Sequence, residues 1–110
     1  MIKVDFKQIK WRKVVGNGRS GREKASESQT KLIRMLEFSP KWNEKTWCEL
    51  GHVGFVLKGR LCLNLGKETV RIAPGQAFVI ERGEKHKAFC KSKTTVFLVG
   101  ESLSAHSPEA

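Results

Sequence analysis

The sequence predicts an all-β domain, built as a barrel or sandwich of short antiparallel strands. Apolar residues alternate with polar ones over short runs, and turn residues separate these runs at intervals of about 8–12 residues. The length of 110 residues fits one domain, and 39% of the residues are hydrophobic, which is sufficient for a globular core. Long helices do not alternate with strands in the sequence, so a parallel sheet is not expected.

The second half of the chain has the most regular pattern. The three leucines of residues 60–65 recur at every second position, so they share one face of a strand. Turn signals such as Lys58-Gly59 and Ala73-Pro74-Gly75 separate the runs. We expect strands over residues 32–38, 52–57, 60–65, 68–72, 77–80, 86–90 and 94–99, and an extended segment over 46–49.

The first thirty residues differ from the rest in composition. Apolar residues alternate loosely up to residue 15, which predicts short strands. Glycines and polar residues follow, and they predict a long loop over residues 16–30. We expect residues 1–30 to belong to the same domain as a barrel over 31–100, with a flexible tail over 101–110.

Cysteine usage and hydropathy predict the compartment. The N-terminus lacks the apolar run of a signal peptide, and no stretch approaches the length of a membrane span. Three widely spaced cysteines, an odd number, argue against a disulfide framework. We therefore expect a cytoplasmic protein with free thiols and no contact with a membrane.

The net charge of +10 raises the hypothesis of a nucleic-acid partner. Nine basic and three acidic residues lie within residues 1–31, so most of the excess precedes the predicted barrel. Trp11 is the only aromatic residue among the basic residues Lys10, Arg12 and Lys13, and no binding motif is present. A solvated basic surface is therefore the favoured interpretation.

Two stretches resemble motifs of the cupin superfamily. HVGFVLKG, from His52 to Gly59, resembles the end of the first cupin motif, and the stretch from Gly75 to His86 resembles the second. The resemblance covers about residues 30–100 and implies a double-stranded β-helix, or jelly-roll barrel. It also implies a homodimer in which N-terminal strands add to the partner's sheet; residues 1–15 would supply them.

The metal-ligand positions depart from the cupin pattern. That pattern has two histidines and a glutamate in the first motif, where this chain has Thr46, Cys48 and His52. His86 matches the histidine of the second motif, and Glu81 stands where a proline is usual. The resemblance therefore supports the fold more strongly than the usual metal site, because this fold hosts many chemistries.

The residues themselves suggest an altered metal site. Cys48-x3-His52 and His86-x3-Cys90 form a mirrored pair, and residues four apart on a strand share a face. Two thiolates and two imidazoles suit a divalent transition metal such as zinc or iron. The alternative is that the cysteines fill the core and the histidines only form hydrogen bonds. The residues expected to line a pocket are Thr46, Gly54, Phe55 and Phe78, where Gly54 would leave room beside the ligands.

Three functions follow from these patterns. The first is a small cupin that binds a small molecule, with or without a metal in the barrel. The second is a metal-dependent enzyme of dioxygenase or isomerase type, with Glu49 or Glu81 as general base. The third is a basic protein that binds nucleic acid or a regulatory partner. Candidates for binding an anionic substrate are Arg34, Arg71 and Arg82.

Overall fold

The computed structural model describes residues 1–16 and 19–102 as one 3-10 turn and nine strands. Every pairing between strands is antiparallel, so the prediction of an all-β fold of short antiparallel strands is confirmed. The elements are η1 (Phe6–Gln8), β1 (Arg12–Gly16), β2 (Arg19–Glu27), β3 (Lys31–Phe38), β4 (His52–Lys58), β5 (Leu61–Asn64), β6 (Thr69–Ile72), β7 (Ala77–Ile80), β8 (Lys87–Phe89) and β9 (Thr94–Glu101).

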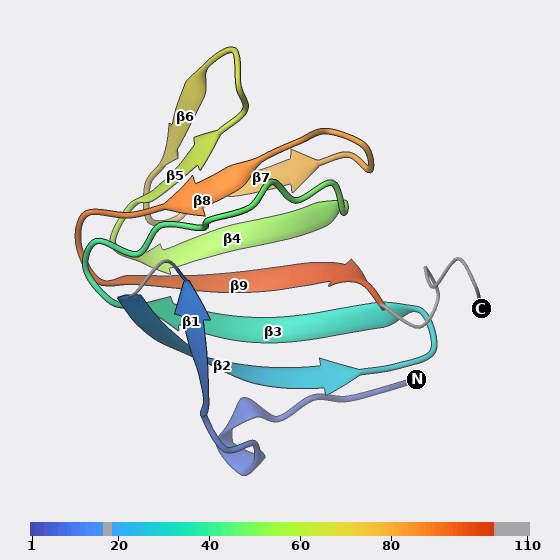
Figure 1. Cartoon of the computed structure of the whole chain (residues 1–110). Helices are drawn as coiled ribbons and strands as arrows, with labels where there is room; N and C mark the ends of the chain where they lie inside the picture. The colour runs from blue at the N-terminus through green and yellow to red at the C-terminus, as the bar shows by residue number, and fades with distance from the viewer. Residues whose placement is uncertain (17–18, 103–110) are drawn as a thin grey trace.

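The strands form two sheets that enclose one core. The larger sheet has the order β1-β2-β3-β9-β4-β7 and the smaller has the order β6-β5-β8. Figure 1 shows β2, β3, β9 and β4 running side by side, with the β5–β6 hairpin beyond them. Both sheets contribute to the buried cluster, which includes Leu36 and Val96 from the larger sheet and Leu61 and Leu63 from the smaller.

Alternation along the strands decides which side chains reach the interior. In β9, buried residues alternate strictly with half-buried ones, and β3 ends in the same pattern at Leu36 and Phe38. Since successive strand residues point to opposite faces, residues of one parity line the space between the sheets. The inner face of the larger sheet therefore carries His52, Leu98 and Arg34 in neighbouring positions, through the ladders of β4, β9 and β3.

A glycine sets the turn between β4 and β5. Gly59 has φ +80, and a Cβ there would lie 2.3 Å from the carbonyl oxygen of Lys93. Both the left-handed backbone and the close approach exclude other residues without strain. The turn predicted at Lys58-Gly59 is therefore confirmed, and it follows an irregularity in the β4–β9 pairing after Val56.

The N-terminal prediction was partly wrong. Residues 1–11 contain η1 and no strand, and the expected loop over 16–30 is largely β2, which pairs with β1 and β3. The Phe6 ring packs edge-on against Phe97, with 6.1 Å between ring centroids, and the Lys24 ammonium donates to the Phe6 carbonyl at 2.8 Å. Backbone pairing on both sides stabilises β2 although its side chains are mostly polar.

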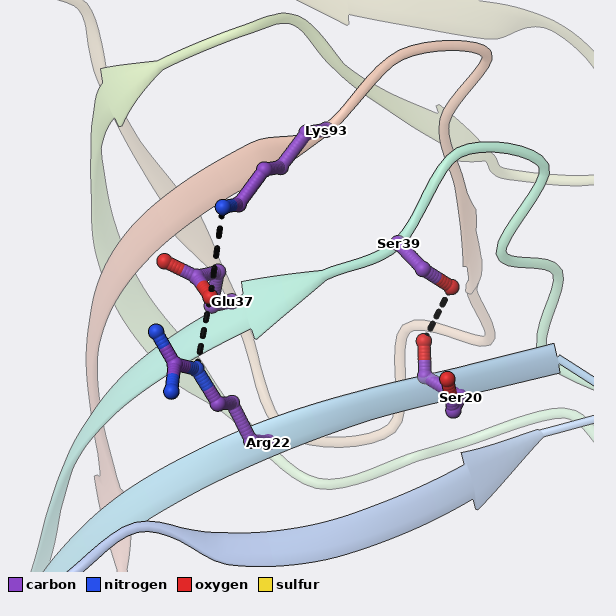
Figure 2. A network of polar contacts seen from close by, with 5 residues as sticks. All are labelled: Ser20, Arg22, Glu37, Ser39 and Lys93. Atoms are coloured by element: carbon purple, nitrogen blue, oxygen red, sulfur yellow. Dashed lines mark hydrogen bonds and ion pairs between the residues drawn. The ribbon is translucent and has the colours of Figure 1, made fainter.

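Polar contacts join the ends of β2, β3 and β9. The Glu37 carboxylate contacts Arg22 Nε at 2.6 Å and Lys93 Nζ at 3.7 Å, and the Ser39 hydroxyl donates to the Ser20 carbonyl (Figure 2). Arg22 lowers the pKa of Glu37 through its hydrogen bond. These contacts lie on the outside of the molecule, so they fasten strand ends and take no part in the interior.

The described part of the chain has no helix of the length and apolar character that spanning a membrane requires. Of the predicted tail, Glu101 still belongs to β9, and residues 103–110 lie outside the described residues.

Candidate functional site

A cavity of about 320 Å³ lies between the two sheets. Most of its wall is apolar and comes from inward-facing residues of both sheets, including Leu36 and Leu98 of the larger sheet and Leu61 and Leu63 of the smaller. Polar side chains also reach it, and two of these are histidines. A small barrel interior of this size holds one small ligand.

Cys48, His52 and His86 form a cluster in the wall of this cavity. One nitrogen or sulfur atom from each residue lies within 4.8 Å of the other two, and the Cys48 Sγ lies 3.7 Å from His52 Nε2. The imidazole rings of His52 and His86 meet edge-on, with centroids 5.3 Å apart. The structure thus brings together three of the four residues that the sequence suggested as ligands.

Local pairing places each member of the cluster. His52 begins β4, and His86 immediately precedes β8. An isolated antiparallel bridge joins Cys48 to His86, because the Cys48 N–H donates to the His86 carbonyl at 2.9 Å and the reverse bond measures 3.0 Å. Cys48 and His86 are therefore fixed opposite each other by main-chain bonds.

Hydrogen bonding orients His86, and burial lowers the pKa of His52. The His86 Nδ1 lies 2.9 Å from the carbonyl oxygen of Glu84, so Nδ1 is the donor in this contact and Nε2 is the nitrogen left for a metal. The pKa of His52 is lowered to about 4, mainly by burial and then by the charges of Arg34 and His86. The His52 imidazole is thus suited to act as a neutral ligand at neutral pH.

The cluster fits a transition metal in chemistry and approximately in size. Tetrahedral zinc with Zn–S and Zn–N bonds of ordinary length separates its ligand atoms by about 3.3–3.8 Å. The 3.7 Å between Cys48 and His52 lies in this range, and the 4.8 Å limit for the cluster requires only a small closing of side chains. The bond from His86 to Glu84 is also the outer contact that orients a metal-binding imidazole.

The expectation that Cys90 joins the site requires correction. Cys90 is 2% exposed, and its thiol donates to the carbonyl of Ser39 at 3.5 Å. Cys90 shares the inward face with His86, but four residues along a strand separate the two by about 13 Å. Cys90 is therefore part of the core, and burial raises the pKa of its thiol.

The four predicted pocket residues have different positions. Phe78 lines the cavity, whereas Thr46 is exposed and does not. Phe55 lies on the outer face of β4 and is 37% exposed, because its parity is opposite to that of His52. Gly54 faces inward, but the ring of Phe78 already occupies the space that a Cβ there would need, so Gly54 leaves no room for a ligand.

The charged candidate residues also differ in whether they line the cavity. Glu49 and Glu81 are exposed and do not line the cavity, so neither is placed as a general base. Of the three arginines suggested for an anion, only Arg34 lines this cavity. Sequence reasoning missed Glu23, whose carboxylate is 5% exposed and contacts Arg34, because β2 was expected to be a loop.

Comparisons with known proteins agree on the fold. Residues 48–100 match the family model described as "Cupin domain". The polyketide cyclase RemF from Streptomyces resistomycificus has a similar structure, with 23% identity, a TM-score of 0.73, and coverage of 92% of this chain and 79% of that one.

Two further solved structures give the same result. KdgF from Halomonas sp. has 19% identity and a TM-score of 0.68, over 89% of this chain and 91% of that one. A predicted oxalate decarboxylase from Thermotoga maritima has 14% identity and a TM-score of 0.73, over 91% and 97%. At these identities the likeness shows the fold alone. No protein of curated function matches the chain.

Proposed function

Because this chain contains a cupin domain, we propose that it binds a small molecule between its two sheets, beside a divalent metal ion held by Cys48, His52 and His86. The observation that carries this proposal is the meeting of three ligand atoms within 4.8 Å in the wall of an otherwise apolar cavity. A thiolate with two imidazoles favours zinc or iron over magnesium or calcium.

The ligand set suggests how the metal would serve the small molecule. Three protein ligands leave a tetrahedral ion one further position, as in catalytic rather than structural zinc sites. An ion bound there would supply a Lewis acid for an oxygen atom of the ligand. The chain's own residues would position that ligand, since most of the cavity wall is apolar.

Metal analysis tests this proposal. We expect protein prepared without a histidine tag to bind one equivalent of Zn²⁺ after chelator treatment and reloading, measured by elemental analysis. Cys48→Ser and His86→Ala should lose most of this metal. Cys62→Ala is a matched control because Cys62 is a free thiol outside the cluster, and His106→Ala removes the third histidine. Equal metal in wild type and His86→Ala would overturn the site.

Binding is the function that these contacts support best, and the enzyme of dioxygenase or isomerase type is the alternative. The structure supplies no support for the general bases considered for it, because Glu49 and Glu81 lie outside the cavity. The titles of similar structures name a cyclase and a predicted decarboxylase, and these activities belong to those proteins. Turnover by this chain stays a prediction.

Nucleic-acid binding receives little support from the N-terminal charges. Arg12 pairs with Glu23, and Arg22 pairs with Glu37, so part of the positive charge has partners within the chain. Arg22 and Lys24 also lie over the Trp11 ring, at 4.1 and 5.0 Å from its centroid. Titration of random duplex at several salt concentrations would test this function, since phosphate contacts produce a steep salt dependence.

Assembly and location are further parts of the proposal. β1 and β7 form the two edges of the larger sheet, and an edge strand can pair with a second copy. We therefore expect a homodimer, which light scattering after size exclusion would measure. The expectation of a cytoplasmic protein would be tested by cell fractionation.

A further inference from the structure

Unpartnered hydrogen-bond donors gather around the cavity. Among the described residues, the buried side-chain nitrogen or oxygen atoms without a hydrogen-bond partner are Arg34 Nε, Trp42 Nε1 and His52 Nδ1, and all three residues line the cavity. Arginine Nε and tryptophan Nε1 can only donate. Buried donors almost always have an acceptor, so these atoms indicate a ligand that supplies acceptor oxygens.

Arg34 is the charged member of this set, and strand register places it near His52. Arg34 pairs with Leu98 across β3 and β9, and Leu98 pairs with Gly54, two residues after His52 on β4. The side chain of Arg34 is only 24% exposed. Arg34 and His52 both line the cavity, on the same inner face of the larger sheet.

The contact with Glu23 does not satisfy the hydrogen-bond donors of Arg34. The distance from Arg34 Nη1 to Glu23 Oε1 is 3.6 Å, longer than an ordinary hydrogen bond, and Glu23 also pairs with Arg12. Two guanidinium groups therefore share the Glu23 carboxylate, so Glu23 alone does not neutralise both. Glu44 and Glu101 also line the cavity, and Glu44 accepts from the Ala88 N–H at 2.7 Å.

We propose that the cavity binds a small organic carboxylate, which Arg34 receives through its unpartnered Nε and adjacent nitrogen while the apolar wall holds the rest of the ligand. A guanidinium offers parallel donors that match the two oxygens of a carboxylate. This inference deepens the proposed function, because it assumes that the cavity is the binding site, but it does not depend on the metal.

The other two arginines considered for an anion serve as comparisons. Arg71 is exposed on β6 and lines a separate, more open pocket, and Arg82 is exposed after β7. Neither has a buried donor without a partner. Arg71→Gln therefore removes the same charge from the same fold without touching the proposed subsite.

The test compares benzoate with benzamide, which has nearly the same shape and no charge. We expect saturable benzoate binding by wild type in calorimetric titration, and binding at least about tenfold weaker by Arg34→Gln, as the loss of a charge-assisted contact implies. Benzamide should bind weakly and equally to both proteins. Arg71→Gln should bind benzoate as wild type does.

Two more variants keep the test valid if Arg34→Gln unfolds. Arg34→Lys keeps a charge beside Glu23 but loses the planar fork, so it should bind benzoate more weakly than wild type. Glu23→Gln removes the carboxylate that competes for Arg34, so it should bind benzoate more tightly. Benzoate binding that is absent in wild type, matched by benzamide, or unchanged in Arg34→Lys and Glu23→Gln would overturn the subsite.

Metal content, measured on the same preparations, separates this inference from the metal site. Binding of benzoate that depends on Arg34 in protein without stoichiometric zinc would support the subsite and reject the metal. Stoichiometric zinc in wild type and in Arg34→Gln, with no binding of benzoate by either, would reject the subsite and keep the metal.

Discussion

Gly54→Ala tests how tightly Phe78 closes the cavity wall. A Cβ at position 54 would lie 2.2 Å from Cζ of Phe78, and 2.5 and 2.9 Å from its two Cε atoms, where ordinary contacts begin at 3.4 Å. Gly54 is not among the residues with positive φ, so the backbone accepts alanine and the penalty is steric. Overpacking of this kind costs about 1–3 kcal/mol.

Phe78→Leu should relieve this clash because leucine lacks the ring atoms that the new methyl group meets. We expect Gly54→Ala to lower the free energy of unfolding by about 2 kcal/mol, and the double variant to recover at least about 1 kcal/mol relative to additivity. Urea titration followed by tryptophan fluorescence measures all four proteins, provided that the m-values agree. Additive effects, with a coupling energy below about 0.5 kcal/mol, would refute the packing argument.

Two further predictions concern the cluster. Cys48 is half-buried, whereas Cys62 and Cys90 are buried, so we expect one thiol to react quickly with a disulfide reagent and the other two to react only on unfolding. Bound zinc should protect the Cys48 thiol. Fast reaction of all three thiols would contradict this prediction. The pKa of His52 is lowered from 6.5 to about 4 in the folded protein. Between these pH values only the unfolded state takes up the proton, so metal-free protein should lose stability as the pH falls from 6.5 towards 4. After a discount for solvent screening, we expect a loss of about 2 kcal/mol in the free energy of unfolding, measured by urea titration. His52→Asn should lack this loss, and parallel pH profiles of the two proteins would refute the prediction.

Period-two alternation predicted the strands whose side chains divide into an inner and an outer face. β4 and β9 fall close to their predicted ranges because burial of one face dictates their sequence. β2 escaped prediction because its stability comes from backbone pairing to β1 and β3, which leaves no apolar pattern. η1 escaped because three residues are too few to show a period.

The sequence predicted site residues only where residues close along the chain are also close in the folded structure. Spacing suggested Cys48 with His52 as residues on one strand, yet Cys48 lies outside β4 and reaches the cluster through its bridge to His86. Spacing also suggested Cys90, whose distance along the chain takes it into the core. The contact of Arg34 with Glu23 depends on the register of β2 against β3, which no local pattern contains.

The charge balance of the cavity couples the two ligands proposed for it. The charge of Arg34 already disfavours a proton on His52, and by the same repulsion it disfavours a metal cation at the cluster. A carboxylate bound to Arg34 would neutralise that charge, so it should raise the affinity for zinc, and zinc should raise the affinity for the carboxylate by the same factor. We expect benzoate to tighten zinc binding several-fold in wild type and not in Arg34→Gln, measured by competition with a chromophoric chelator. Equal zinc affinity in wild type with and without benzoate would show that the two sites are independent, because linkage requires the effect to be reciprocal.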